Sequence, residues 1–168
     1  MRIEVVPAGE QDKPVVRNLG RLYIYDFSEF MGLRCPDGGM FDCTGWCHYW
    51  EKDHHWPFLV RADGELAGFA LVCDVTSADE YDHDMGEFFV LRKFRRKGVG
   101  KSAAFQVFDR LPGAWEVRQI PENRPAIAFW RAVIGAYTGA RCRESLEYFP
   151  RHKREMNVIR FSAERSGG

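Results

Sequence analysis

Apolar and polar positions follow two different spacings along the chain, one typical of strands and one typical of helices. Short apolar runs predict strands at residues 2–6, 56–62, 65–75, 87–91, 115–120, 142–149 and 156–161. Apolar residues that recur every three or four positions predict helices at 14–30, at 98–111 and at 126–134, with a short helix at 46–55. The Asp63-Gly64 pair between two of these strands predicts a tight hairpin.

The order of the elements indicates a mixed sheet. The strand–helix–strand portion, residues 87–120, predicts a right-handed parallel crossover. The hairpins predict antiparallel neighbouring strands, so the sheet should contain both parallel and antiparallel pairs. Helices should cover its faces, which gives a mixed α/β (α+β) fold. Because no repeat, linker or low-complexity tract interrupts the pattern, we expect residues 1–168 to form a single domain.

Composition narrows the class of protein. The chain has 168 residues, of which 45% are hydrophobic and 29% charged, and this excludes a disordered or collagen-like chain. Twenty-four basic residues balance 24 acidic ones, so we expect neither a nucleic-acid partner nor a membrane partner. The segment Met1–Val6 lacks a hydrophobic signal core, and the five irregularly spaced cysteines are interpreted as reduced thiols. These features predict a cytoplasmic protein.

Residues 86–102 carry the strongest chemical signal. A predicted strand leads into a turn with Gly98 and Gly100, and a helix follows. A helix N-terminus offers unpaired backbone N–H groups and a partial positive charge, and glycines let a ligand approach them closely. The turn adds six cations: Arg92, Lys93, Arg95, Arg96, Lys97 and Lys101. We therefore predict a site for a phosphorylated ligand.

Two nucleotide-binding motifs fit this segment poorly. The sequence Gly100-Lys101-Ser102 suggests a P-loop, but that motif needs a glycine where Arg95 stands. A P-loop would make nucleotide binding depend on magnesium. A dinucleotide-binding turn needs a third small residue, which Ala103 supplies, but no acidic residue follows about twenty positions later in a second strand.

A third pattern fits better. Arg95-Arg96-Lys97-Gly98-Val99-Gly100 matches Gln/Arg-x-x-Gly-x-Gly/Ala, and the preceding Glu87-Phe88-Phe89-Val90 is similar to Glu-Leu-x-Val. Downstream, 123–130 follows Asn-x-x-Ala-x-x-(Leu/Phe)-Tyr except at its last residue, Trp130. These three linked motifs resemble the GNAT superfamily of acetyl-CoA-dependent N-acetyltransferases, and they cover about a quarter of the chain.

The resemblance implies a fold, a reaction and a site. The fold would be a mostly antiparallel central sheet with one parallel strand–helix–strand unit and helices on both faces. The reaction would move an acetyl group from acetyl-CoA, as co-substrate, directly to a primary amine in a ternary complex. Glu87 would be the general base. Cofactor binding would fall to Phe89, Val90, Leu91, Arg95, Arg96, Lys97, Gly98, Val99, Gly100, Lys101, Asn123 and Trp130.

The identity of the general acid is undetermined, because the family often uses a tyrosine at the position of Trp130 and an indole N–H has no useful acidity. The acid that protonates the leaving thiolate would be Tyr137, a water molecule, or no group at all. Tyr137 would share the helix face only if the helix continued past Gly135. The same substitution keeps an alternative open: a catalytically inactive acyl-CoA-binding sensor or partner protein.

The acceptor is predicted only as an amine, either a small molecule or a peptide. The acidic residues Asp74, Asp79, Glu80, Asp82, Asp84 and Glu87 would attract a cation, although a solvated turn is the more common role of such a stretch. In the family, the region that corresponds to this aromatic segment lies near the acceptor pocket. The side chains that would line the pocket, or simply pack in the core, are Trp46, Tyr49, Trp50 and Trp56. The resemblance also allows a homodimer.

A zinc site is the alternative interpretation of the cysteine-rich segment. Cys43 and Cys47 have a spacing that zinc sites use, and Cys35, His48, His54 and His55 are close in sequence. No second well-spaced pair follows, so we expect a packed aromatic loop and no metal. Tyr23, Phe27 and Phe30 stand at helical spacing and are predicted to pack in the core.

Overall fold

The computed structural model describes residues 1–74, 82–150 and 152–164. Its strands form one seven-stranded sheet in the order β1-β2-β3-β4-β5-β7-β6. The strands are β1 (Ile3–Pro7), β2 (His55–Ala62), β3 (Glu65–Cys73), β4 (His83–Val90), β5 (Gly113–Gln119), β6 (Cys142–Phe149) and β7 (Arg154–Ala163). The prediction of a mixed, mostly antiparallel sheet is confirmed, because only β4 and β5 run parallel.

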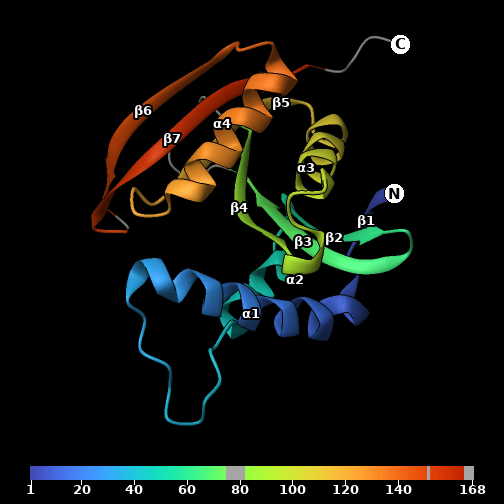
Figure 1. Ribbon diagram of the computed structural model, residues 1–168, viewed down its shortest axis with the longest axis vertical. Coiled ribbons are helices and arrows are strands. Elements are labelled where there is room, and N and C mark those ends of the chain that lie inside the picture. Colours follow the sequence, from blue (N-terminus) through green and yellow to red (C-terminus); the bar gives the residue numbers. More distant parts are fainter. Residues whose placement is uncertain (75–81, 151, 165–168) are drawn as a thin grey trace.

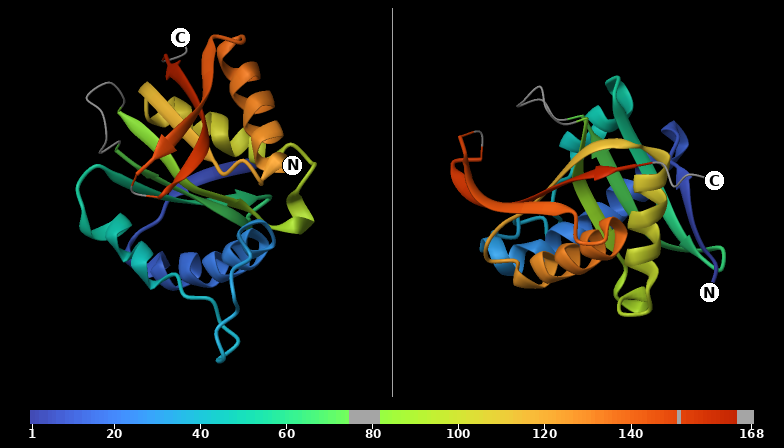
Figure 2. Two further views of the ribbon diagram at one scale, coloured as in Figure 1. Left: turned by 90° about the vertical axis from the view of Figure 1, so that its left-hand side faces the viewer. Right: turned by 90° about the horizontal axis from the view of Figure 1, so that it is seen from above.

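Helices cover both faces of the sheet (Figures 1 and 2). The α-helices are α1 (Lys13–Met31), α2 (His48–Glu51), α3 (Val99–Arg110) and α4 (Arg124–Thr138), and the 3-10 turns are η1 (Glu10–Asp12), η2 (Thr44–Cys47) and η3 (Arg92–Phe94). One hydrophobic cluster lies under α3 and α4, and a second lies under α1 and α2. Among the described residues, no helix is long and apolar enough to cross a membrane.

The predicted elements agree with the observed ones except at their ends. The short helix predicted at 46–55 is split into η2 and α2, and its last residue already begins β2. The helix predicted at 126–134 continues through Gly135 to Thr138, because its apolar face remains buried against the sheet beyond the glycine. The strand predicted at 65–75 ends at Cys73, and Val75 lies outside the described residues.

The parallel pair of strands stays together over a very short distance. In the described part of the chain, β4 and β5 pair through two residue pairs, His83 with Trp115 and Asp84 with Glu116. Beyond Asp84, β4 continues to Val90 while remaining paired with β3. The edge of β4 that faces β5 is therefore open from Met85 onward. This opening separates the two halves of the sheet next to the sequence motif predicted to bind phosphate.

An irregularity in β4 decides which side chains share a face. Leu71 pairs with Glu87, but the next residue of β3, Val72, pairs with Met85, so Gly86 is an extra residue in β4. Without this bulge, Asp84 and Glu87 would point to opposite faces. With it, both lie on the face covered by α1 and α2, since their partners Cys73 and Leu71 pack in that cluster.

Candidate active site

Glu87 lies on β4, at the open edge of the sheet, and faces helix α1. Burial raises the pKa of Glu87 to about 7, and the negative charge of Asp84 adds to this effect. A hydrogen bond from Tyr23 and the positive charge of Arg118 act in the opposite direction. A carboxylate with a pKa near neutrality is suited to accept a proton at physiological pH.

Aromatic side chains surround this carboxylate on the α1 side. The ring of Tyr23 lies 6.0 Å from that of Phe89 and 5.7 Å from that of Trp46. The prediction that Tyr23 packs in the core is confirmed, but its hydroxyl also reaches Glu87. Its position at helical spacing gives no signal of this second role.

Of the four aromatic residues predicted to line the acceptor pocket, Tyr49 lies close enough to Glu87 to feel its charge. Burial raises the pKa of Tyr49, and the charge of Glu87 raises it further. Trp46 packs on Tyr23 and Phe69. Trp50 donates its indole N–H to the carbonyl of Ala8, and Trp56 packs against His83. The structure therefore brings Tyr49 and Trp46 to the site and places the other two elsewhere.

Gly86 leaves room for Tyr49. A Cβ atom at Gly86 would overlap the hydroxyl oxygen of Tyr49. Replacing Gly86 with alanine should therefore destabilise the fold by about 1–3 kcal/mol, the usual cost of overpacking. Adding Tyr49→Phe should recover most of this loss, because the phenylalanine ring lacks the clashing oxygen. Chemical unfolding of the two variants measures both effects.

The control for this prediction is Gly135→Ala on α4. Nothing lies within 4 Å of a Cβ atom built at Gly135, so this change should be neutral or stabilising. If Tyr49→Phe leaves the instability of Gly86→Ala unchanged, contact with the tyrosine hydroxyl is not the cause.

Charged side chains are buried on the same face of the sheet, beyond Glu87. Asp84 and Glu116 are 3% and 2% exposed, and Arg118 forms ion pairs with both. Arg160 joins Glu116 to Glu147 on β6. Sequence analysis favoured a solvated turn for the acidic stretch that contains Asp84, and for Asp84 this is wrong, because its charge is paired inside the protein. Asp79 and Glu80 lie outside the described residues.

This buried cluster was missed by sequence analysis, although a signal existed. Glu116 and Arg118 alternate with the apolar residues Trp115 and Val117 along β5. Alternate charges on a strand usually indicate a face exposed to water. Here β7 supplies Arg160 from 44 positions further along the chain, and this arginine donates a hydrogen bond to one carboxylate oxygen of Glu116. Only the tertiary pairing identifies these charges as a buried network.

The open edge of β4 presents different backbone groups from those predicted. The amide of Leu91 donates to the carbonyl of Ala67 on β3. The backbone N–H and C=O groups of successive residues in a strand point to alternate sides, so those of Phe89 and Leu91 both face β3. Phe88 and Val90 consequently face the opening. Of the predicted edge Phe89–Leu91, Val90 alone has this orientation, and Phe88 is the residue that sequence analysis missed. The side chain of Arg95 donates to the carbonyl of Val90 at 2.7 Å.

The predicted phosphate-binding turn has the expected local geometry. Gly98 precedes α3 with φ of 81°, a left-handed conformation that favours glycine, and nothing lies within 4 Å of its missing side chain. Within α3 the amide of Ser102 donates to Gly98, so the amides of residues 99–101 find no partner inside the helix. Arg96, Lys97 and Lys101 are exposed at this end of the helix.

Two expectations about the turn need correction. Its cations are not all available to a ligand, since Arg92 and Arg95 bind Asp26 and Lys93 binds Glu65. Gly100 is closely approached by the protein itself: a Cβ atom there would lie 3.1 Å from the ring of Phe129 on α4. The absence of a side chain at Gly100 therefore serves packing of α3 against α4.

The remaining predicted site residues lie on α4. The side-chain oxygen of Asn123 caps the helix by accepting from the amide of Ala126 at 3.1 Å, which leaves its NH₂ group for other partners. Trp130 is buried, with its ring 5.1 Å from that of Phe88 at the opening. Tyr137 instead donates to Asp109 near the end of α3, on the face opposite Glu87. The structure does not bring Tyr137 to the predicted base.

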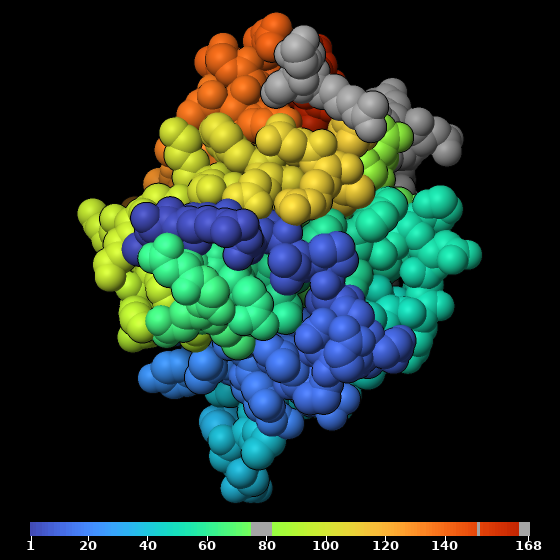
Figure 3. Space-filling view, turned by 90° about the vertical axis from the view of Figure 1, so that its right-hand side faces the viewer, coloured from blue at the N-terminus to red at the C-terminus, as the bar shows by residue number. Residues whose placement is uncertain are grey.

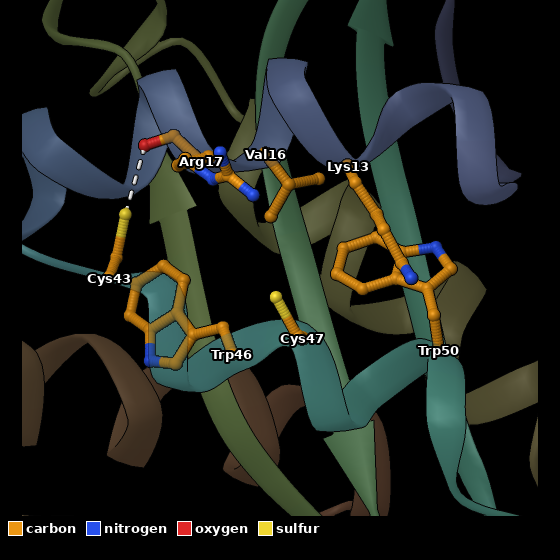
Figure 4. Close-up of a pocket in the computed structure, with 7 residues that line it drawn as sticks. All are labelled: Lys13, Val16, Arg17, Cys43, Trp46, Cys47 and Trp50. Atoms are coloured by element: carbon orange, nitrogen blue, oxygen red, sulfur yellow. Dashed lines mark hydrogen bonds between the residues drawn. The ribbon is translucent and has the colours of Figure 1, made fainter.

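The cysteine-rich segment packs against α1. The thiol of Cys43 donates to the carbonyl of Arg17 at 3.1 Å. A small pocket opens between α1 and the η2–α2 segment, lined by Lys13, Val16, Arg17, Cys43, Trp46, Cys47 and Trp50 (Figure 4). This pocket does not include Glu87. In the part of the chain that the structure describes, no group of three or more potential metal ligands converges.

The exposed loop between α1 and η2, residues 32–43, projects from the body of the molecule (Figure 3). Leu33 and Met40 on this loop are 41% and 54% exposed. The loop follows the end of α1, the helix whose Tyr23 contacts Glu87.

The sheet opens beside the N-terminus of α3, and Glu87, a carboxylate with a pKa near neutrality, lies at the edge of this opening. This arrangement agrees with the acyltransferase class that the motifs predict. Residues 23–136 match the family model described as "Acetyltransferase (GNAT) family". The chain therefore belongs to the GNAT acetyltransferase family. A search of curated proteins returned no match.

Solved structures show the same fold. An acetyltransferase from Thermus thermophilus has 15% identity and a TM-score of 0.70, with 96% of this chain and 97% of that chain covered. The ribosomal-protein-S18-alanine N-acetyltransferase from Escherichia coli has 14% identity, a TM-score of 0.64 and coverage of 99% and 97%. Mycobacterium smegmatis RimJ in complex with CoA-disulfide has 21% identity, a TM-score of 0.64 and coverage of 99% and 84%.

Proposed function

We propose that this acetyltransferase moves an acetyl group from acetyl-CoA to a primary amine by direct transfer in a ternary complex. The observation that carries the proposal is the position of Glu87. This carboxylate has a pKa of about 7 and stands on β4, whose open edge leads to the turn at the start of α3. One strand thus joins a base to a phosphate-binding turn.

The residues present fit acetyl-CoA as co-substrate. The diphosphate would be held by the unpaired amides of 99–101 and by Arg96, Lys97 and Lys101. The amide-containing arm would lie along the opening, where the backbone of Phe88 and Val90 faces away from β3. The NH₂ group of Asn123 is available from α4. The co-substrate supplies an activated acetyl thioester.

The chain's own contribution to the chemistry is proton removal. Glu87 in its ionised form accepts a proton from the acceptor ammonium, directly or through water, and the free amine then attacks the acetyl carbonyl carbon. The new C–N bond replaces the C–S bond, the electron pair leaves with sulfur, and the nitrogen releases its second proton to water. An unperturbed thiol has a pKa of about 8.5, so the leaving thiolate does not require a strong acid.

Neither Tyr137 nor Trp130 is suited to act as the general acid. The hydroxyl of Tyr137 donates a hydrogen bond to Asp109, and burial together with this contact raises the pKa of Tyr137. Trp130, the residue near the opening, has only an indole N–H. We therefore propose that the thiolate leaves unassisted or takes its proton from water.

An amine acceptor is consistent with the charges around Glu87. Carboxylates outnumber cations on this face of the sheet: Glu87, Asp84, Glu116 and Glu147 against Arg118, Arg143 and Arg160. The resulting negative potential draws a protonated amine.

Calorimetric titration with CoA and acetyl-CoA tests the co-substrate site, with ATP plus magnesium as the control ligand. We expect micromolar binding of both CoA compounds and no response to ATP. If CoA compounds bind, a screen of primary amines for CoA release follows. Absence of CoA binding would contradict both the acetyltransferase and the inactive-sensor proposals.

A further inference from the structure

Asp26 on α1 connects the acceptor side of the molecule to the basic turn. One carboxylate oxygen lies 2.6 Å from the guanidinium of Arg92, and the other lies 2.5 Å from that of Arg95. The Asp26 side chain is 21% exposed, so these ion pairs are partly shielded from water. A single residue of α1 thus binds two of the cations that sequence analysis attributed to the phosphate site.

Arg95 extends this connection to the strand edge. Its Nε donates to the carbonyl of Val90 at 2.7 Å, and its guanidinium lies 5.4 Å from the centre of the Phe89 ring. Because Val90 faces the opening of the sheet, the position of Arg95 affects the edge along which the co-substrate would lie. Asp26 fixes the outer end of this guanidinium.

The same face of α1 reaches the predicted base. Tyr23 precedes Asp26 by three residues, so the two side chains are neighbours on the helix surface. The Tyr23 hydroxyl bonds to Glu87, and its ring packs on Phe89. One turn of α1 therefore contacts both Glu87 and, through Asp26, the turn that precedes α3.

We propose that Asp26 is a positioning residue that couples occupation of the basic turn to the placement of α1 and Tyr23. This inference rests on the proposed function, because it requires CoA to bind at the turn. A diphosphate bound to the turn restricts the motion of residues 91–98, the segment that carries Arg92 and Arg95. Because both arginines are already paired with Asp26, this restriction extends to Asp26 and its helix. Binding at one site is thereby communicated to the other.

Hydrogen exchange with and without CoA provides the test, since it needs no knowledge of the acceptor. In the wild-type protein, CoA should slow exchange at the amides of the turn and also in α1 around Tyr23 and Asp26. Couplings of this kind are typically about fivefold or more, so we expect at least that effect in α1. In Asp26→Asn, the turn should still be protected, while the CoA-dependent protection of α1 should fall below about twofold.

Glu65→Gln is the matched control. Both carboxylate oxygens of Glu65 on β3 accept hydrogen bonds from Lys93 of the same turn, but Glu65 is not part of α1. Its loss should leave the response of α1 to CoA unchanged. Arg92→Gln, at a side chain that is 73% exposed, removes one of the two Asp26 contacts without risk to the core and should give an intermediate response.

The outcomes separate the inference from the function on which it rests. If CoA protects the turn but α1 responds equally in wild type and Asp26→Asn, the coupling role is wrong and the CoA site stands. If CoA accelerates exchange in α1, the phosphate competes with Asp26 for the arginines, which also overturns the proposal. If CoA protects neither segment, the co-substrate site fails and the coupling fails with it.

A purely structural role for Asp26 predicts a different pattern. In that case Asp26→Asn would raise exchange in α1 by the same factor with and without CoA, and the ratio between the two conditions would not change. Asp26→Glu, which retains the carboxylate, should restore the CoA-dependent part of the protection. Failure of this variant to restore any of it would count against the carboxylate as the coupling group.

Discussion

Replacing Glu87 with glutamine is expected to lower kcat by about 10²–10⁴-fold, the usual contribution of a general base. Glutamine has nearly the same shape and keeps a hydrogen-bond acceptor for Tyr23, but it cannot accept the ammonium proton. The turn that would hold CoA lies at the start of α3 and does not involve this side chain. Acetyl-CoA affinity should therefore remain within about twofold of wild type.

The pH dependence gives an independent check on this role. Because the proposed base is the ionised form of Glu87, whose pKa is about 7, activity should be low below pH 7. kcat/KM should rise through neutrality as Glu87 loses its proton. The Glu87→Gln variant should lack this inflection and retain only the slope that comes from ionisation of the acceptor amine itself.

The control for this prediction is Glu29→Gln, an exposed carboxylate on α1. It should leave turnover and its pH profile unchanged. Equal turnover in wild type and Glu87→Gln would remove Glu87 from the mechanism. Wild-type protein that binds CoA but acetylates no amine would instead favour the inactive-sensor alternative.

Replacing Gly98 with valine is expected to weaken acetyl-CoA binding by about 10–100-fold. Gly98 has φ of 81°, and a left-handed conformation costs an ordinary residue about 1–2 kcal/mol. A β-branched side chain increases this strain, which lowers the stability of the fold. Affinity falls because the side chain also fills the open space before α3 that the diphosphate would occupy, and each 1.4 kcal/mol of lost binding energy corresponds to about a tenfold change in Kd. Calorimetric titration with acetyl-CoA measures the loss.

The hairpin between β2 and β3 offers a matched control. Gly64 also has φ of 81° and open space where a side chain would extend, but it lies in the Asp63-Gly64 turn. Gly64→Val should therefore cost similar stability without any change in acetyl-CoA affinity. If both variants bind equally well, Gly98 is a structural glycine and the diphosphate is held elsewhere.

Local sequence patterns predicted the strand, turn and helix around Gly98 well. The strand before Leu91, the turn at Gly98 and the helix from Val99 depend on neighbours within a few residues, so periodicity and turn chemistry identify them. Details that depend on pairing between distant strands were predicted less well. Which backbone groups of 88–91 face the opening depends on register with β3, and register is not a property of β4 alone.

Long-range partners changed the meaning of several residues. The arginines of the basic turn looked available because no acid is adjacent in sequence, yet Asp26 binds two of them from 66 and 69 positions away. Similarly, Gly135 suggested the end of a helix, but the packing of Tyr137 against Phe105 and Phe108 keeps α4 continuous. Tertiary contacts outweighed local propensity in both cases.

By itself, the sequence determined the mixed sheet, the parallel crossover, the family and the turn at the start of α3. The elements follow from short-range spacing, because strand and helix periods and glycine turns are set by neighbouring residues, and the family follows from the resemblance of three short motifs. Only the tertiary structure decided that Asp84 and Glu87 share a face and that Tyr23 reaches Glu87. It alone joined Asp26 to the basic turn. These contacts bring together residues distant in sequence, and bulges and strand register determine which side chains meet.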